Sequence, residues 1–289
     1  MRASLLMVLV CVLFAAGCRR GEVVTESPPE QPSAAASEAN DPSVTISAAD
    51  PNGYDYAEKE EIRRKYALKP GTLVKIYGIN GPVTVETAET ETAEILIIRS
   101  ARKKEDLQFG QITIEQTPER LEIGKEGDRR SIFSAFSTIP EGRQRAILKL
   151  PRQVDFEANG ISENLTVDEI KGRLKIRGVS GKVLVKRVIG ETTLSGLNGE
   201  TDVTFGPMTG YPVDVFGVNG EVTLRFEGEV NANLLARGNN GEIESDLPGF
   251  EKKEDEERPG RIETRIGQGG AEIEIRGVNG NVKLLKAGK

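Results

Sequence analysis

The sequence predicts an all-β fold, a β-solenoid or solenoid-like stack of short strands, with one short N-terminal helix after a disordered tether. Three observations support this prediction: a high glycine content, a recurring turn phrase and a regular spacing of that phrase. Glycine contributes 32 of 289 residues, about 11% of the chain against a usual share of about 7%. The excess therefore needs a structural explanation.

The turn phrase is Gly-x-Asn-Gly, or a close variant of it. It occurs at residues 78–81, 178–181, 196–199, 217–220, 238–241 and 277–280. Asn and Gly tolerate the positive φ angles that tight turns require. Most copies are followed by apolar residues at alternate positions, as at Val183/Val185 and Val222/Leu224, which is the pattern of half-buried strands.

The spacing of the glycines indicates a repeat period in the sequence. Gly172, Gly181, Gly190 and Gly199 fall at intervals of nine, and Gly220 and Gly241 follow Gly199 at intervals of 21. One strand and one turn would fill the shorter interval, and two such units would make a coil of 18 to 21 residues. An antiparallel meander with Asn-Gly hairpins also fits. The stack is favoured because the same turn returning on every second strand would align along one edge.

The N-terminus resembles a bacterial lipoprotein signal. The apolar run Leu5–Ala16 is too short to span a bilayer but suits a signal peptide over residues 1–17. It ends in Ala-Ala-Gly before Cys18, which resembles a lipobox, so Cys18 would carry the acyl chains and Cys11 would leave with the signal. By the same resemblance Arg19 points to the outer membrane of the cell envelope. The alternative is an ordinary secretory signal.

Two segments separate this signal from the repeat. Residues 18–52 are rich in Pro, Ser, Ala and Glu and poor in aromatic residues, a composition typical of a disordered tether. Residues 53–69 are predicted to form the short helix, because Glu60–Arg64 and Glu61–Lys65 are i,i+4 pairs in the favourable order. The remaining residues, 70–289, form the predicted β-strand-repeat domain.

The composition excludes several kinds of function. The chain has no histidine, so it has no Ser-His-Asp triad and no His-ligated metal. The net charge of −6 has the wrong sign for a nucleic-acid partner. No catalytic residue, metal ligand or cofactor is predicted.

Several segments resemble the putative-adhesin β-strand-repeat domains of bacterial envelope proteins, also called Toastrack domains. Residues 71–85 resemble the opening of these domains, Leu148–Pro151 their mid-domain Leu-x-Val-Pro step, and residues 266–280 their closing Gly-rich motif. The resemblance covers residues 70–289. It implies a β-strand-repeat fold and an adhesin-like or ligand-sensing role at the envelope, and it carries no catalytic residues.

Two sets of residues depart from the plain repeat. Residues 124–145 break the strand alternation and contain Arg129, Arg130, Phe133 and Phe136, residue types that dominate protein interfaces. The alternative is that the two phenylalanines plug an open end of the stack.

Glu200, Glu221 and Glu242 recur at intervals of 21 and would stack on successive coils. Such carboxylates repel one another, so a divalent cation could bridge them. The alternative is a solvent-exposed acidic edge.

Together these features predict a lipid-anchored binding or scaffold protein of the cell envelope, adhesin-like and non-catalytic. Its expected partners are the membrane, through acyl chains on Cys18, and an unknown protein or glycan of the envelope. The main alternative is a sensor or regulator module of a stress-response system. A polysaccharide-active β-helix enzyme is a further alternative, because carboxylate chemistry does not need histidine.

Overall fold

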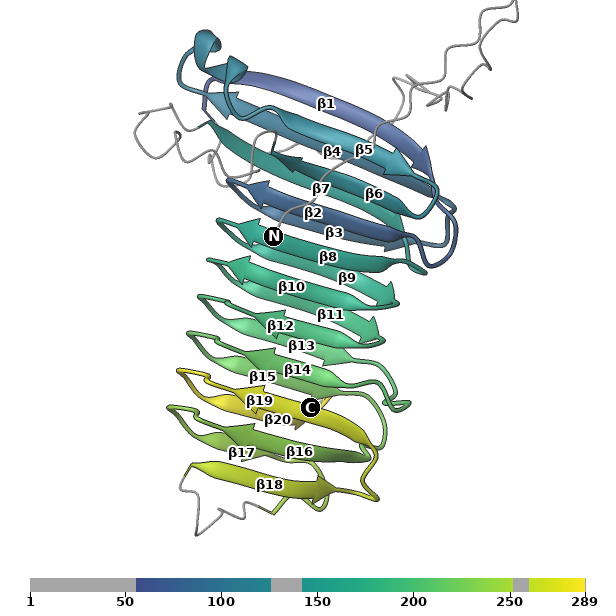
Figure 1. Cartoon of the computed structure of the whole chain (residues 1–289), viewed down its shortest axis with the longest axis vertical. Coiled ribbons are helices and arrows are strands. Elements are labelled where there is room, and N and C mark those ends of the chain that lie inside the picture. The colour runs from purple at the N-terminus through teal and green to yellow at the C-terminus, as the bar shows by residue number, and fades with distance from the viewer. Residues whose placement is uncertain (1–55, 126–141, 252–259, 289) are drawn as a thin grey trace, which may run out of the picture. The chain divides into compact units, whose positions relative to one another are not determined.

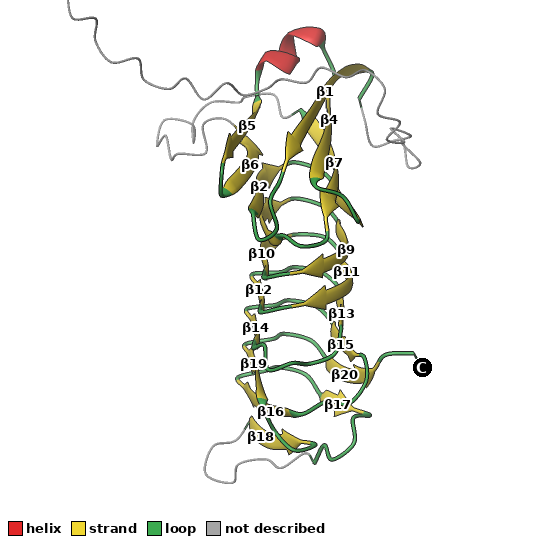
Figure 2. Cartoon of the chain, turned by 90° about the vertical axis from the view of Figure 1, so that its right-hand side faces the viewer, coloured by secondary structure: helices red, strands yellow, loops and turns green. Residues whose placement is uncertain are grey.

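The computed structural model describes residues 56–125, 142–251 and 260–288, all of which belong to one unit spanning Ser37–Lys289. These residues form an all-β fold of two ten-stranded mixed sheets, and one 3₁₀ helix, η1 (Lys104–Gln108). Figure 2 shows the two sheets facing each other, with turns connecting them.

The two sheets are named here by their strand order. Sheet A runs β1 (Glu58–Ala67), β4 (Thr92–Ala101), β7 (Arg143–Pro151), β3 (Val83–Ala88), β9 (Leu165–Lys171), β11 (Val183–Ile189), β13 (Thr201–Phe205), β15 (Val222–Phe226), β20 (Val282–Lys286) and β17 (Ile243–Ser245). Sheet B runs β18 (Arg261–Ile266), β16 (Ala232–Arg237), β19 (Ala271–Arg276), β14 (Val213–Phe216), β12 (Thr192–Ser195), β10 (Leu174–Val179), β8 (Asp155–Ile161), β2 (Leu73–Ile79), β6 (Arg120–Lys125) and β5 (Ile112–Thr117).

From β8 to β15 consecutive strands alternate between the sheets, so one strand of sheet B and the next strand of sheet A make one coil. Successive coils pair in parallel: Leu165 lies beside Val183, and Val183 lies beside Thr201. These partners are 18 residues apart, and the partners Thr201 and Val222 are 21 apart. The predicted period of 18 to 21 residues is therefore confirmed, and the antiparallel meander is wrong for this part of the chain.

The core lies between the sheets and is built from every second residue of each strand. Leu174 and Ile176 of β10 are almost completely buried, while the residue between them is half-buried. Phe205 and Phe226 of neighbouring coils stack with their ring centroids 5.1 Å apart. Burial of each such aliphatic or aromatic side chain contributes roughly 1.5–3 kcal/mol, so the repeated inward rows supply the main driving force for folding.

The predicted helix over residues 53–69 is wrong. β1 occupies most of this segment and pairs antiparallel with β4 along its whole length. The charges that suggested a helix make contacts between strands: the Lys65 Nζ lies 3.4 Å from Glu94 of β4, and Glu60 accepts a hydrogen bond from Arg99. Pairing with a neighbouring strand has overridden the local helical preference.

Antiparallel strands lie at both ends of the parallel region. β4 pairs antiparallel with β1 and β7, β5 and β6 form an antiparallel pair, and β18 pairs antiparallel with β16. The edge strand β1 carries seven charged residues among its ten. Charged edge strands resist pairing with other chains.

The last coil of the chain is out of sequence order. β19 pairs in parallel with both β14 and β16, and β20 pairs in parallel with both β15 and β17. Coil β19–β20 therefore lies between coils β14–β15 and β16–β17, as its yellow ribbons between green ones show in Figure 1. The interval of 21 that separates Gly220 from Gly241 does not mark neighbouring coils.

Backbone hydrogen bonds between neighbouring coils continue through the Gly-x-Asn-Gly turns, which connect one sheet to the other. In one turn, the Asn219 N–H donates to the Leu197 carbonyl oxygen at 2.8 Å, and the Gly220 N–H donates to the Asn279 carbonyl oxygen at 3.0 Å. Gly220 has a φ of 143°, and a Cβ there would lie 2.3 Å from the Gly199 carbonyl oxygen. The neighbouring backbones approach too closely for any side chain at this position.

We predict that Gly220→Ala destabilises the fold much more than Gly277→Ala. A Cβ at Gly277 meets nothing within 4 Å, so only its positive φ of 60° opposes alanine, at about 1–2 kcal/mol. Gly220→Ala adds overpacking between coils and should cost about 4 kcal/mol in total. Urea unfolding measures both values, and equal losses would contradict the close approach.

A second prediction concerns two buried threonines in the inward rows. Thr201 lies between Val183 and Val222, and its buried hydroxyl has no hydrogen-bond partner among the residues that the structure describes. Thr201→Val should raise the free energy of unfolding by about 1–2 kcal/mol, because an unsatisfied buried group is removed. Thr192→Val is the matched control, since the Thr192 hydroxyl donates to the Gly190 carbonyl oxygen at 3.3 Å. A gain that is the same for both variants would contradict this account.

Candidate functional site on the outer face of sheet B

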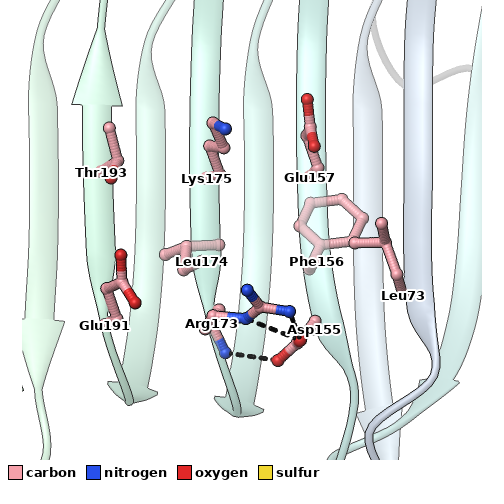
Figure 3. Close-up of a pocket in the computed structure, with 9 residues that line it drawn as sticks. All are labelled: Leu73, Asp155, Phe156, Glu157, Arg173, Leu174, Lys175, Glu191 and Thr193. Carbon is pink, nitrogen blue, oxygen red and sulfur yellow. Dashed lines mark hydrogen bonds and ion pairs between the residues drawn. The ribbon is translucent and has the colours of Figure 1, made fainter.

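A shallow hollow of about 150 Å³ lies on the outer face of sheet B, across β2, β8, β10 and β12 (Figure 3). Its lining residues come from strands that are adjacent in the sheet but separated along the chain. They are Leu73, Asp155, Phe156, Glu157, Arg173, Leu174, Lys175, Glu191 and Thr193.

An ion pair between Asp155 and Arg173 occupies one end of the hollow. The Asp155 carboxylate accepts hydrogen bonds from the Arg173 backbone N–H at 2.8 Å, from Nε at 2.8 Å and from Nη2 at 2.6 Å. The hydrogen bonds from Arg173 to Asp155, and then the opposite charge, raise the pKa of Arg173 above its ordinary value. The carboxylate is thus held in an ion pair, and three of its roughly four acceptor sites are occupied.

Two further carboxylates, those of Glu157 and Glu191, also line the hollow. Glu157 and Glu191 lie at opposite ends of the hollow (Figure 3). Glycoside hydrolysis needs two carboxylates that face each other across the scissile bond. In the described part of the chain there is also no group of three acidic, histidine or cysteine residues that could hold a metal ion.

Elsewhere on the outer faces, charged side chains link coils that are one or two positions apart in the stack. Arg187 contacts Glu169 at 2.7 Å and Glu227 at 2.9 Å, and the hydrogen bonds to Glu227 are the main reason that the pKa of Arg187 is raised. Arg225 contacts Asp202 at 3.1 Å. Exposed pairs contribute at most about 1 kcal/mol each, so their main effect is to fix the positions of side chains along extended faces.

A ladder of asparagine side chains runs along the turns. Asn240 donates from Nδ2 to Oδ1 of Asn279, Asn279 to Asn219, and Asn219 to Asn198, each at 3.0 Å. All four side chains are exposed. Each carboxamide has a second N–H and further acceptor capacity beyond the ladder. The sequence predicts these residues only as turn formers, although their recurrence at one position of the phrase is a signal for a side-chain ladder.

Two of the predicted sets of site residues lie outside the described residues. These are the acylation site Cys18 and the interface residues Arg129, Arg130, Phe133 and Phe136; both stay predictions. In the ranges that the structure does describe, no helix has the length and hydropathy needed to cross a bilayer.

The predicted ladder of three carboxylates is wrong. Glu200 and Glu221 lie on neighbouring coils, but the inserted last coil separates Glu221 from Glu242. Asn281 of that coil takes the intervening position, and its Oδ1 accepts a hydrogen bond from the Glu242 N–H at 3.0 Å. In addition, Glu221 pairs with Lys283 at 3.0 Å. The arrangement therefore lacks the row of adjacent carboxylates that a bridging cation would need.

Comparison with solved structures finds similar chains. A protein from Clostridium sporogenes described as a putative cell adhesion protein is 14% identical over 78% of this chain and 100% of its own, with a TM-score of 0.40. A putative adhesin from Bacteroides fragilis is 9% identical over 78% and 97%, with a TM-score of 0.32. One from Parabacteroides merdae is 10% identical over 79% and 96%, with a TM-score of 0.27. No family model and no curated protein matches the chain.

Proposed function

We propose that the chain is a lipid-anchored binding or scaffold protein of the bacterial cell envelope, adhesin-like and without catalytic activity. The observation that carries this proposal is the construction of the outer faces. Their charged side chains pair between coils, as Arg187 does with Glu169 of the next coil and with Glu227 two coils away, and form extended surfaces. Such surfaces suit the recognition of an extended partner, as in other stacked-repeat proteins.

The sequence supports the location in this proposal. Cys18 follows a signal-like apolar run, and acyl chains on it would attach the protein to the membrane. The composition of residues 18–52 supports a spacer between this anchor and the stack. The alternating winding supports a solenoid-like repeat of the adhesin (Toastrack-like) type.

The proposal is tested in bacterial cells that express the full chain and grow with radiolabelled palmitate. Wild type and Cys11→Ser should take up label and fractionate with membranes, whereas Cys18→Ser should do neither, because Cys18 is the only thiol expected in the mature chain. Crosslinking of the same intact cells should then capture an envelope protein or glycan.

Three results would contradict parts of this proposal. Equal labelling of Cys18→Ser would remove the lipid anchor. Capture of a membrane sensor would favour the alternative, a sensor or regulator module of a stress response. Turnover of a captured glycan by the purified chain would show an enzyme.

A further inference from the structure

Six residues that face outward on sheet B lie in register on six adjacent strands, from β10 to β18. This arginine row consists of Arg177, Ser195, Phe216, Arg276, Arg237 and Arg261. It holds four arginines and no carboxylate, although the chain as a whole has a net charge of −6. The row therefore gathers four guanidinium groups on one face of an acidic protein, and three of them pair with carboxylates of the next row: Arg276 with Asp214, Arg237 with Glu274 and Arg261 with Glu263.

Three of the arginines are immediate neighbours. Arg276 lies beside Arg237, and Arg237 lies beside Arg261, on strands about 4.8 Å apart. Like charges directly opposite each other on a sheet are destabilising. The insertion of coil β19–β20 creates this arrangement, because it places Arg276 between Phe216 and Arg237.

The acidic partners of these arginines belong to the next row, farther from the turns. Nη2 of Arg276 donates to Asp214 at 3.0 Å, and Nη2 of Arg237 donates to Glu274 at 2.9 Å. A guanidinium has five N–H donors, so donors remain for a ligand after these contacts. Arg177 is exposed and makes no ion pair within the described residues.

The asparagine ladder runs parallel to the arginine row, three residues later on four of the same strands. A glycine and one further residue separate the two on each coil, and a Cβ at Gly238 or Gly277 would meet nothing within 4 Å. Beside Arg237 and Arg276, the glycine between arginine and amide thus leaves space for a ligand lying along the stack. Phe216 adds an aromatic ring, with the Arg276 guanidinium carbon 5.0 Å from its centroid.

We infer that the arginine row and the asparagine ladder together bind a linear acidic glycan. Guanidinium groups donate paired hydrogen bonds to carboxylates, and side-chain amides both donate to and accept from hydroxyls. The aromatic ring suits the apolar C–H face of a sugar ring. This inference rests on the proposed envelope-binding function and names the ligand class and the surface that takes it.

A glycan fits this surface better than an acidic peptide does. Amide and guanidinium groups recur from strand to strand along the stack, so they match a polymer with a repeating unit of carboxylates and hydroxyls. Arginine clusters also recognise acidic peptides, but a polymer of acidic residues lacks the hydroxyls that the neutral amides of the asparagine ladder would bind.

The test measures binding of the full chain, purified in detergent, to fluorescent polygalacturonate. The variant Arg177→Gln/Arg237→Gln should raise the Kd at least about tenfold, as loss of two interface arginines typically does. The control Lys186→Gln/Lys283→Gln removes the same charge from the outer face of sheet A and should stay within about twofold. Wild-type binding should weaken as NaCl screens the exposed charges, and thermal unfolding should be alike for all three proteins.

Other outcomes would overturn the inference. Equal binding by both double variants would place the glycan elsewhere, and equally tight binding of neutral dextran would remove the role of charge. If poly-L-glutamate bound as tightly as polygalacturonate, and the arginine variant lost this binding, the surface would be assigned to acidic peptides. Absence of polygalacturonate binding, while crosslinked cells still capture an envelope partner, would refute this ligand and leave the proposed function standing. Failure of both experiments would refute both.

Discussion

The close approach of one turn backbone to the next is the constraint on which the rest of this structure depends. The last glycine of every phrase except 178–181 lies where a Cβ would meet a backbone carbonyl oxygen of a neighbouring segment, 2.2 Å away at Gly280 and 2.3 Å away at Gly220. Because no side chain intervenes, turn N–H groups donate to the turns on either side, and the hydrogen-bond ladder passes from sheet to sheet. Register is thereby fixed, since a slip of one residue would turn inward residues outward.

Because the register is fixed, equivalent positions of successive coils align, and similar side chains form rows along the stack. Aliphatic rows face inward, ion pairs such as Arg225–Asp202 connect coils on the outer faces, and amides form a ladder along the turns. The arginine row takes its neighbouring residues from segments that are between 18 and 60 positions apart in the chain. A surface of this kind is a property of the stack, so its charge and shape depend on which coils are neighbours.

The sequence predicts the period, the two strands per coil and the turn edge, because glycine spacing and apolar alternation each reflect one local geometric requirement. It does not predict β1, since Ile62 and Tyr66 are four residues apart, a spacing that fits one face of a helix and one face of a strand equally well. It also does not predict the order of the coils. Residues 217–220 and 277–280 have the same sequence, Gly-Val-Asn-Gly, so a local pattern cannot identify which turns are neighbours. The arginine row depends on that order and could not be found before the fold was known.

The insertion of the last coil is tested most directly by disulfide trapping in a chain whose Cys11 and Cys18 are replaced by serine. Thr223 lies beside Lys283, and Lys283 lies beside Glu244. Adjacent strands are about 4.8 Å apart, within the range of Cα separations that disulfides span, whereas alternate strands at about 10 Å are beyond it. Thr223→Cys/Lys283→Cys should therefore oxidise to a crosslinked monomer, and Thr223→Cys/Glu244→Cys should stay reduced. Crosslinking of the second pair and not the first would contradict the coil order and, with it, the arginine row.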